Sequence, residues 1–158
     1  MRGIEEVPQY WKRSKIIVLL KKGDKTLPNN YRLICITPML YKLFSRILRS
    51  RIHKKLDEAQ SKDQAGFRAE FGCINYIFTL TAITKRANEF GKLLWIATDD
   101  FEKVFDSVEY KAIWMALLEQ GIEPAYVTLL QRLYDGQEAV VHTDERSAPF
   151  KIEKGTKQ

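Results

Sequence analysis

The chain has 158 residues, of which 45% are hydrophobic and 11% aromatic, which is enough for one domain with a buried core. Its longest aliphatic run, Ile16–Leu20, is five residues long, far short of the roughly 20 that cross a bilayer. The cysteines, Cys35 and Cys73, cannot form a disulfide scaffold, and no His/Cys cluster indicates zinc. The first ten residues show no secretory signal, so we expect an intracellular protein, nuclear or cytoplasmic, and not a secreted or membrane protein.

Charge is unevenly placed along the chain. Residues 1–90 hold 18 Lys and Arg against 8 Asp and Glu, whereas residues 91–158 hold 8 against 12. A basic half attracts polyanions, of which nucleic acid is the commonest, and adjacent carboxylates in an acidic half can collect a divalent metal. A polymerase or nuclease needs both features, although ordinary solvated surface charge gives the same composition.

Two strands are predicted first along the chain. The β-branched run Ile16–Leu20 predicts a buried strand that ends in the basic turn Lys21–Lys25. After a loop, Tyr31–Ile36 predicts a second short strand.

From Pro38 the hydrophobic period changes to that of an amphipathic helix, which we expect to run to about Ala59. Its predicted apolar face consists of Leu40, Leu43, Phe44, Ile47 and Leu48. Its predicted polar face carries Lys42, Arg46, Arg49 and His53, with Arg51 pointing toward the apolar side. A polar loop over Ser61–Gly72 then leads to a second helix over Ile74–Phe90.

The second half opens with a predicted buried strand, Leu93–Ala97, which ends at Asp99 and Asp100. Asp106 and Glu109 resemble a capping box that opens a helix to about Gln120. The remaining predicted elements are a helix over Pro124–Tyr134 and a strand pair over Gln137–His142 and Pro149–Ile152. Since strands and helices are interleaved without regular alternation, the predicted fold class is α+β.

The strongest local motif runs from Asp100 to Asp106. A carboxylate between a buried strand and a helix is held rigidly beside a cleft, and two-metal nucleotidyl transfer needs ligands of this kind. One Asp is insufficient for that chemistry, and an Asp in this position is also a common helix cap. The motif alone therefore leaves both interpretations open, and for Asp106 it favours the cap.

Segments spread in order over nearly the whole chain match the motifs of one known family. In the first half they are Val7-Pro8, Trp11-Lys12, Ile16-Ile17, Lys21–Asp24, Asn30-Tyr31-Arg32, Tyr41–Ile52 and Gln64–Arg68. In the second half, Asp100–Val108 resembles the palm motif Asp-aromatic-x-Lys-Ala-Phe-Asp-Ser-Val, and Gly155–Gln158 resembles the start of Gly-x-x-Gln-Gly-x-Pro. On these motifs the chain resembles the reverse transcriptases of non-LTR (LINE-type) retrotransposons.

The resemblance implies an incomplete domain made of right-hand polymerase fingers with a partial palm. Residues 1–90 would form a fingers-like basic region with two helices, and residues 91–158 a partial palm that carries the first catalytic Asp motif. The parent enzyme would be an RNA-directed DNA polymerase that uses Mg²⁺, deoxynucleotides, an RNA template and a DNA primer, without a membrane partner.

The resemblance also implies residue roles. Asp100 would be a catalytic metal ligand, and Phe105 would be the aromatic steric gate that selects deoxynucleotides. Arg32 would reach the incoming triphosphate, Arg68 would contact nucleotide or template, and Gln158 would sit near the nascent base pair.

The remaining expected nucleic-acid contacts are basic side chains, namely Lys21, Lys22, Lys42 and Arg46. Each expected role has an alternative. Phe105 could be simple core packing, and Arg32 could pair with a carboxylate. Lys21 and Lys22 could belong to a solvated turn.

The chain ends at Gln158, before the Ala-Asp-Asp motif and the thumb of the family. We therefore expect it to lack polymerase activity, and we retain two alternatives: a non-catalytic RNA- or DNA-binding fragment, and a decayed copy without function. Strand alternation also predicts that Asp99 faces the core if Asp100 faces the cleft. In that case Asp99→Ile would raise the thermal stability, because an unpaired buried carboxylate is costly.

Overall fold

The computed structural model describes residues 6–61, 63–68, 72–143 and 146–157. The chain divides into two compact units, one of residues 1–52 and 103–158 and the other of residues 53–102. Helix α1 (Met39–Ala59) begins in the first unit and ends in the second. Within the described residues, no helix is long and apolar enough to span a membrane.

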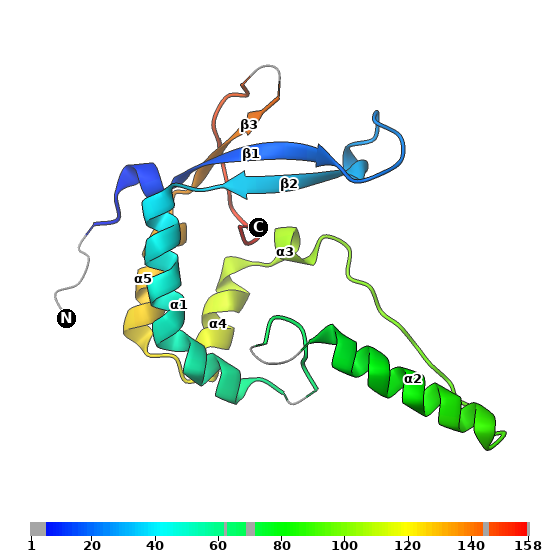
Figure 1. Cartoon of the computed structure of the whole chain (residues 1–158). Helices are drawn as coiled ribbons and strands as arrows, with labels where there is room; N and C mark the ends of the chain where they lie inside the picture. Colours follow the sequence, from blue (N-terminus) through cyan, green and yellow to red (C-terminus); the bar gives the residue numbers. More distant parts are fainter. Residues whose placement is uncertain (1–5, 62, 69–71, 144–145, 158) are drawn as a thin grey trace. The chain divides into compact units, whose positions relative to one another are not determined.

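The first unit contains a mixed sheet that has four strands within the described residues (Figure 1). The strands are β1 (Arg13–Leu20), β2 (Tyr31–Ile36), β3 (Glu138–His142) and β4 (Phe150–Lys151), in the order β2-β1-β3-β4. β1 pairs antiparallel with β2 and parallel with β3, and β4 pairs antiparallel with β3. The two predicted strands of the first half and the predicted strand pair near the C-terminus are confirmed as strands. The predicted burial of Ile16–Leu20 is wrong, because Ile16 is buried but Leu19 is 51% exposed.

The turn between β1 and β2 is closed by short-range polar contacts. The Asp24 carboxylate accepts hydrogen bonds from the backbone N–H and the hydroxyl of Thr26, both at 2.8 Å. These bonds hold the pKa of Asp24 below its usual value, the backbone bond contributing most. The side chain of Asn30, at the end of a short 3₁₀ turn (Pro28–Asn30), donates to the carbonyl of Asp24 at 2.8 Å. The basic loop is therefore folded back on itself at the end of the hairpin.

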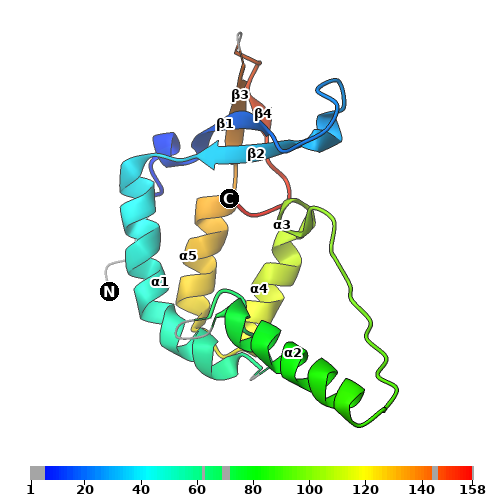
Figure 2. The same ribbon diagram turned by 45° about the vertical axis from the view of Figure 1, so that its right-hand side comes forward.

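The core of the first unit lies between α1 and α5 (Pro124–Tyr134). Tyr41, Leu48 and Leu133 are its buried centre, and a 3₁₀ turn at Gln9–Trp11 brings Trp11 against it. Figure 2 shows α1, α5 and α4 (Tyr110–Glu119) standing side by side below the sheet. Gly121, with a φ of 77°, ends α4 as its position in the sequence suggested.

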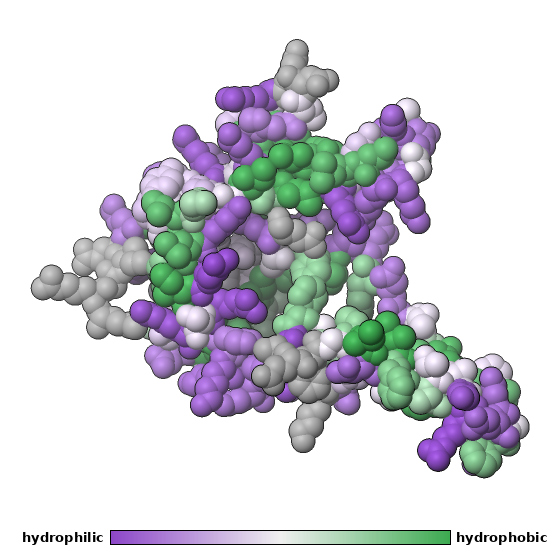
Figure 3. Space-filling model, in the orientation of Figure 1, coloured by the Kyte–Doolittle hydropathy of each residue, from purple (hydrophilic) through white to green (hydrophobic). Residues whose placement is uncertain are grey.

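The buried face of α1 differs from the predicted one. Tyr41, Leu48 and Ile52 are buried, whereas three of the predicted core residues, Leu40, Leu43 and Ile47, are about half exposed. The reason is that α5 and Trp11 cover the Tyr41 side of the helix. Figure 3 shows apolar surface over this part of α1 and over the β1–β2 hairpin. The Arg51 side chain is exposed.

A single helix over residues 106–120 is not formed, and that prediction is wrong. A one-turn helix, α3 (Val104–Ser107), is followed by α4, which begins at Tyr110 after Glu109. Neither helix has a side-chain cap from the described residues, so the predicted capping box is not formed. The chain is extended at Val108, and the carbonyl of Val108 accepts a hydrogen bond from the N–H of Gly155 at 2.8 Å. A long-range contact thus replaces a helical one at this break.

The second unit consists of the end of α1, a loop and helix α2 (Cys73–Glu89). The loop and the helix are confirmed over their described residues. The predicted buried strand Leu93–Ala97 is wrong, because residues 92–101 have no regular structure and Trp95 is 86% exposed. A strand needs a neighbour that pairs with its backbone, and no described strand pairs with this segment.

Candidate nucleotide and nucleic-acid site

Phe105 lies in the α3 turn, which is built on a left-handed residue. Lys103 precedes the turn with a φ of 49°, and its carbonyl accepts a hydrogen bond from the N–H of Asp106 at 3.0 Å. The Phe105 side chain is 37% exposed. It is thus a partly accessible aromatic residue on a tight turn and not a fully buried core residue.

The last described residues bond to this turn through their backbone. The N–H of Thr156 donates to the carbonyl of Phe105 at 2.7 Å, and the N–H of Gly155 donates to that of Val108. Gly155 is buried with a φ of 86°, and a Cβ there would lie 2.8 Å from the carbonyl oxygen of Asp106. Only glycine allows so close an approach with that backbone conformation. The segment that leads to Gln158 is therefore fixed to the Phe105 turn, and Gln158 itself lies outside the described residues.

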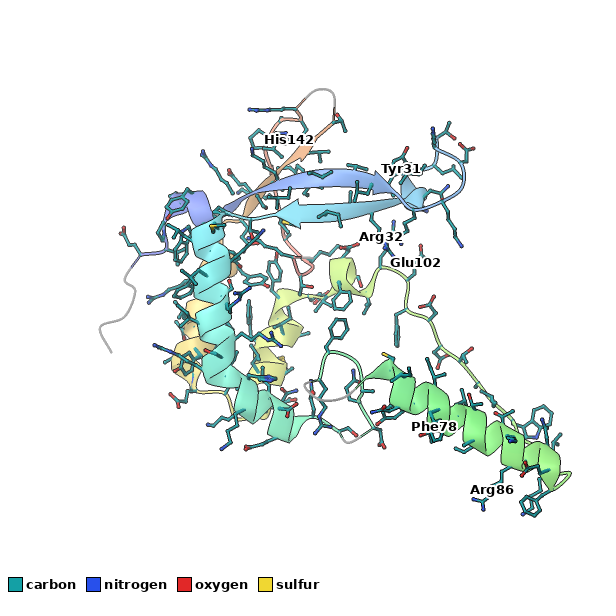
Figure 4. The ribbon with its side chains drawn as sticks, viewed as in Figure 1. Tyr31, Arg32, Phe78, Arg86, Glu102 and His142 are labelled. Carbon is teal, nitrogen blue, oxygen red and sulfur yellow. The ribbon has the colours of Figure 1, made fainter. Side chains whose placement is uncertain are left out.

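Arg32 lies on β2, in the same unit as Phe105. It is exposed and pairs in register with Leu19 of β1. Figure 4 shows the Arg32 side chain leaving β2 on the side of the hairpin where α3 lies. The two regions are joined by a hydrogen bond from Lys103 Nζ to Asn29 Oδ1 at 2.9 Å. The β1–β2 hairpin and the α3 turn are thus tied together by two polar side chains.

The four basic residues expected to contact nucleic acid are all exposed. Lys21 and Lys22 follow β1 directly, and the backbone N–H of Lys21 donates to the carbonyl of Asn30 at 2.8 Å. Lys42 and Arg46 lie one helical turn apart on α1, so their side chains share a face. The structure gives them the accessibility that phosphate contacts require.

Asp100 belongs to the second unit and is exposed, as is Asp99. The two residues are not part of a strand, so the predicted burial of Asp99 is wrong. Among the described residues, no group of three or more His, Cys, Asp or Glu side chains could hold a metal ion. Asp99 and Asp100 are therefore neighbouring exposed carboxylates, and the described part of the chain contains no complete two-metal site.

Arg68 is fixed within the second unit. Its side chain is 14% exposed and lies 3.4 Å from the Asp57 carboxylate, and its guanidinium donates to the carbonyl of Ser61 at 3.1 Å. These contacts brace the loop after α1. A contact from Arg68 to nucleotide or template remains a prediction.

Sequence reasoning missed three residues that shape the site: Lys103, Thr156 and Lys157. Lys103 stands in the palm motif but carries no signal of a bond to Asn29, 74 residues away. Thr156 donates to the carbonyl of Phe105 from its backbone N–H at 2.7 Å and from its hydroxyl at 3.4 Å, and no sequence motif reveals these bonds. Lys157 places its ammonium over the ring of Tyr41, 4.3 Å from the ring centre, and nothing in the spacing of these residues predicts the contact.

The structure is an α+β domain with a mixed sheet, and its sequence motifs resemble those of a nucleic-acid polymerase. A family model for reverse transcriptase (RNA-dependent DNA polymerase) matches residues 19–158. The chain therefore belongs to the reverse transcriptase family.

Curated relatives come from retrotransposable elements. The chain is 28% identical over 153 residues to a putative 115 kDa protein of the type-1 element R1DM of Drosophila melanogaster. The alignment covers 96% of this chain and 14% of that protein. It is 25% identical over 154 residues to an uncharacterized 149 kDa protein of transposon TX1 of Xenopus laevis. That alignment covers 97% of this chain and 12% of the TX1 protein. It is 30% identical over 123 residues to a Pol polyprotein of the type-1 element R2 of Popillia japonica. That alignment covers 78% of this chain and 17% of the polyprotein.

These matches confirm the resemblance to non-LTR retrotransposon reverse transcriptases and the α+β fold class. The chain spans between 12% and 17% of the length of these relatives. It is therefore a part of such a polymerase by similarity. The division into fingers at residues 1–90 and palm at residues 91–158, and the residue roles, remain predictions.

Proposed function

We propose that the chain is the part of a non-LTR retrotransposon reverse transcriptase that grips the incoming deoxynucleotide and the primed RNA template. The observation that carries this proposal is the tie between the hairpin and the α3 turn, through Lys103 and Asn29. It brings the segment of Arg32 and the turn of Phe105 into one compact unit. A guanidinium suits a triphosphate because it donates in a planar fork, and a partly exposed aromatic ring suits the sugar.

Each residue has a separate task in this proposal. Arg32 binds the triphosphate, Phe105 crowds a ribose 2′-hydroxyl, and Gln158 contacts the nascent base pair. Arg68 contacts nucleotide or template. Lys21, Lys22, Lys42 and Arg46 contact phosphates of the RNA template and DNA primer, since exposed cations bind phosphates without regard to sequence.

Mg²⁺ is the proposed cofactor of the longer enzyme, with Asp100 as one ligand. The described residues do not by themselves fit a two-metal site, because their carboxylates do not gather around Asp100. Two ions bound side by side would need further carboxylates. What this chain's residues do in the proposal is bind and orient nucleotide and template.

A non-catalytic nucleic-acid binder is the second candidate function. The lack of a carboxylate cluster among the described residues favours it, as does the exposure of the basic side chains. Both candidates predict binding of an RNA–DNA hybrid. Only the first predicts that Arg32 binds the triphosphate of a nucleotide and that Phe105 discriminates between deoxynucleotides and ribonucleotides.

The test is the salt dependence of binding to a labelled RNA template annealed to a DNA primer, followed by fluorescence anisotropy. We expect binding to weaken steeply with salt, because each neutralised phosphate releases counterions. The double variant Lys42→Glu/Arg46→Glu should bind more weakly, with a slope of log affinity against log salt reduced by about 2.

The matched control is Lys111→Glu/Lys151→Glu, which changes the charge equally at two other exposed positions of the first unit. It should retain the wild-type slope. Equal losses of affinity in both double variants would show that the effect comes from net charge and not from Lys42 and Arg46. Binding that does not change with salt would overturn the assigned phosphate contacts.

A further inference from the structure

Lys157 occupies an unusual environment for a lysine. Its Nζ atom is buried and has no hydrogen-bond partner among the described residues. Beside it lies a cavity of about 570 Å³ between the end of β2, the start of α1 and Tyr134. Among the described residues, the lining of that cavity includes Lys42 and Ser45 but no carboxylate. The ammonium is therefore not matched there by the anionic partner that a buried cation usually requires.

The ring of Tyr41 is what faces the ammonium. Lys157 Nζ lies 4.3 Å from the ring centre, inside the roughly 6 Å within which cation–π attraction acts. Burial lowers the pKa of the Lys157 amine, as expected for a cation that has left water. Attraction to the ring is thus a compensating contact for this side chain, beside the Cys35 thiol, which lines the same cavity.

Tyr41 is itself a fixed platform. It is buried on α1, and Trp11 packs edge-on against it with ring centres 6.2 Å apart. Burial raises the pKa of Tyr41 to about 12, so the ring remains a neutral phenol at physiological pH. The buried, neutral ring of Tyr41 therefore presents a packed aromatic face to Lys157.

The segment that carries Lys157 is held at its other end by the Phe105 turn. The N–H groups of Gly155 and Thr156 donate to the carbonyls of Val108 and Phe105. The three residues 155–157 therefore connect α1 to the α3 turn, and a shift at one end is transmitted to the other through two backbone bonds.

We propose that Lys157 is a positioning residue, whose contact with the Tyr41 ring holds residues 155–157 in the alignment that fixes the Phe105 turn. The role given to Phe105, contact with the sugar of the nucleotide, rests on the proposed function. The contact between Lys157 and the Tyr41 ring, and its effect on the turn, do not depend on the proposed function.

A direct phosphate contact from Lys157 is the competing interpretation. The burial of Nζ argues against it, because a phosphate oxygen would first have to displace the atoms that cover the ammonium. The two interpretations predict different results for Lys157→Met in the absence of ligand. Only a positioning role predicts that residues 155 and 156 become less protected in the free chain.

The first test is amide hydrogen exchange in the whole chain without ligand. In Lys157→Met, exchange at the N–H groups of Gly155 and Thr156 should accelerate about tenfold or more, as expected for local opening of a released segment. The amides of β1, which pair in the sheet, should stay protected. Lys157→Arg, which keeps a cation for the ring, should restore most of the protection.

The ring is tested in the same way. Tyr41→Phe retains an aromatic face and should keep the protection of Thr156, whereas Tyr41→Leu should lose it. Unchanged exchange at residues 155 and 156 in Lys157→Met would overturn the proposal. Equal acceleration at β1 would also overturn it, because the lysine would then support only the general stability of the unit.

The second test measures the preference for dATP over ATP by competition binding to the whole chain. Lys157→Met should lower that preference toward the value of Phe105→Ala. An unchanged preference, together with faster exchange, would overturn the link to Phe105. If the wild-type chain binds neither nucleotide, the proposed function fails, and the exchange experiment still decides whether Lys157 positions the turn.

Discussion

Gly155 shows how a single residue can fix a local structure that no side chain specifies. Its φ of 86° lies in the region that side chains rarely adopt, and its Cα lies against the backbone of Asp106. A left-handed conformation costs an ordinary residue about 1–2 kcal/mol. The close approach adds a steric term, because backbone atoms cannot move aside as a flexible side chain can.

We therefore expect Gly155→Ala to lower the free energy of unfolding by about 2–4 kcal/mol, as measured by urea denaturation. Gly121→Ala is the matched control, because Gly121 has a φ of 77° but a Cβ there would meet no described atom within 4 Å. It should show only the conformational cost of about 1–2 kcal/mol. Equal losses in the two variants would show that the approach to Asp106 is not tight in solution.

Tyr41 predicts a loss of stability at high pH. Its pKa is raised from an ordinary value of 10.0 to about 12, chiefly by burial. Between these values the folded chain keeps a proton that the unfolded chain has released, so the free energy of unfolding falls as the pH rises through this range. A pKa difference of this size corresponds to about 3 kcal/mol at most.

The measurement is urea denaturation at a series of pH values that runs from below the ordinary tyrosine pKa to about 12. Tyr41→Phe has no phenol at this position and should lose less stability over the same range. Burial also raises the pKa of Tyr134 and of Tyr110, and both phenols remain in the variant, so some dependence on pH should persist. Identical pH profiles would mean that Tyr41 is not buried in solution.

At the residue scale, the sequence identified candidates whose residue type carries the chemistry. Arg32 and Phe105 stand in recognisable motifs, and the structure places them in one unit. The contact between Lys157 and Tyr41 could not be predicted in this way. It joins residues far apart in the chain, and the predicted apolar face of α1 did not include Tyr41.

At the scale of elements, the sequence predicted those whose pattern is strong and local. β1 follows from a β-branched run that ends in a basic turn, and α5 begins at Pro124 as predicted. The break between α3 and α4 was not predicted, because it involves a hydrogen bond from the N–H of Gly155 to the carbonyl of Val108, which is distant in the sequence. The buried face of α1 was shifted because the elements that cover it come from elsewhere in the chain.

The segment Leu93–Ala97 is the clearest case in which local pattern and structure disagree. Its composition is that of a buried strand, but Leu93 and Trp95 are 80% and 86% exposed. β-propensity expresses a side chain's fit to a paired, half-buried surface. Without a neighbouring strand among the described residues, that surface does not exist.

The exposure of this segment reverses the expectation for Asp99→Ile. A buried carboxylate would make the substitution stabilising, whereas an exposed one should leave the free energy of unfolding within about 0.5 kcal/mol of wild type. Thermal unfolding of the variant and of wild type measures this difference. Asp100→Asn is a suitable control at the neighbouring exposed position, and a clear rise in Tm for Asp99→Ile alone would show that residue 99 is buried in solution.

At the scale of the whole molecule, binding and catalysis make different demands on the chain. Binding requires exposed cations, and the described residues provide them on the hairpin turn and on α1. Two-metal catalysis requires several carboxylates around one point, and no such group is present among the described residues. The first property can survive in a part of a polymerase that lacks the second.

We therefore expect the pure chain to bind a primed RNA template but not to extend the primer with deoxynucleotides and Mg²⁺. Enzymes lower reaction barriers by roughly 8–23 kcal/mol, and much of that effect in nucleotidyl transfer comes from metal ions held by several carboxylates. A single Asp100 cannot hold two ions in place. Primer extension on a gel measures the activity, and anisotropy on the same sample shows that the template is bound. Extension by wild type that disappears in Asp100→Ala would contradict this expectation, because it would mean that further ligands assemble around Asp100 in solution.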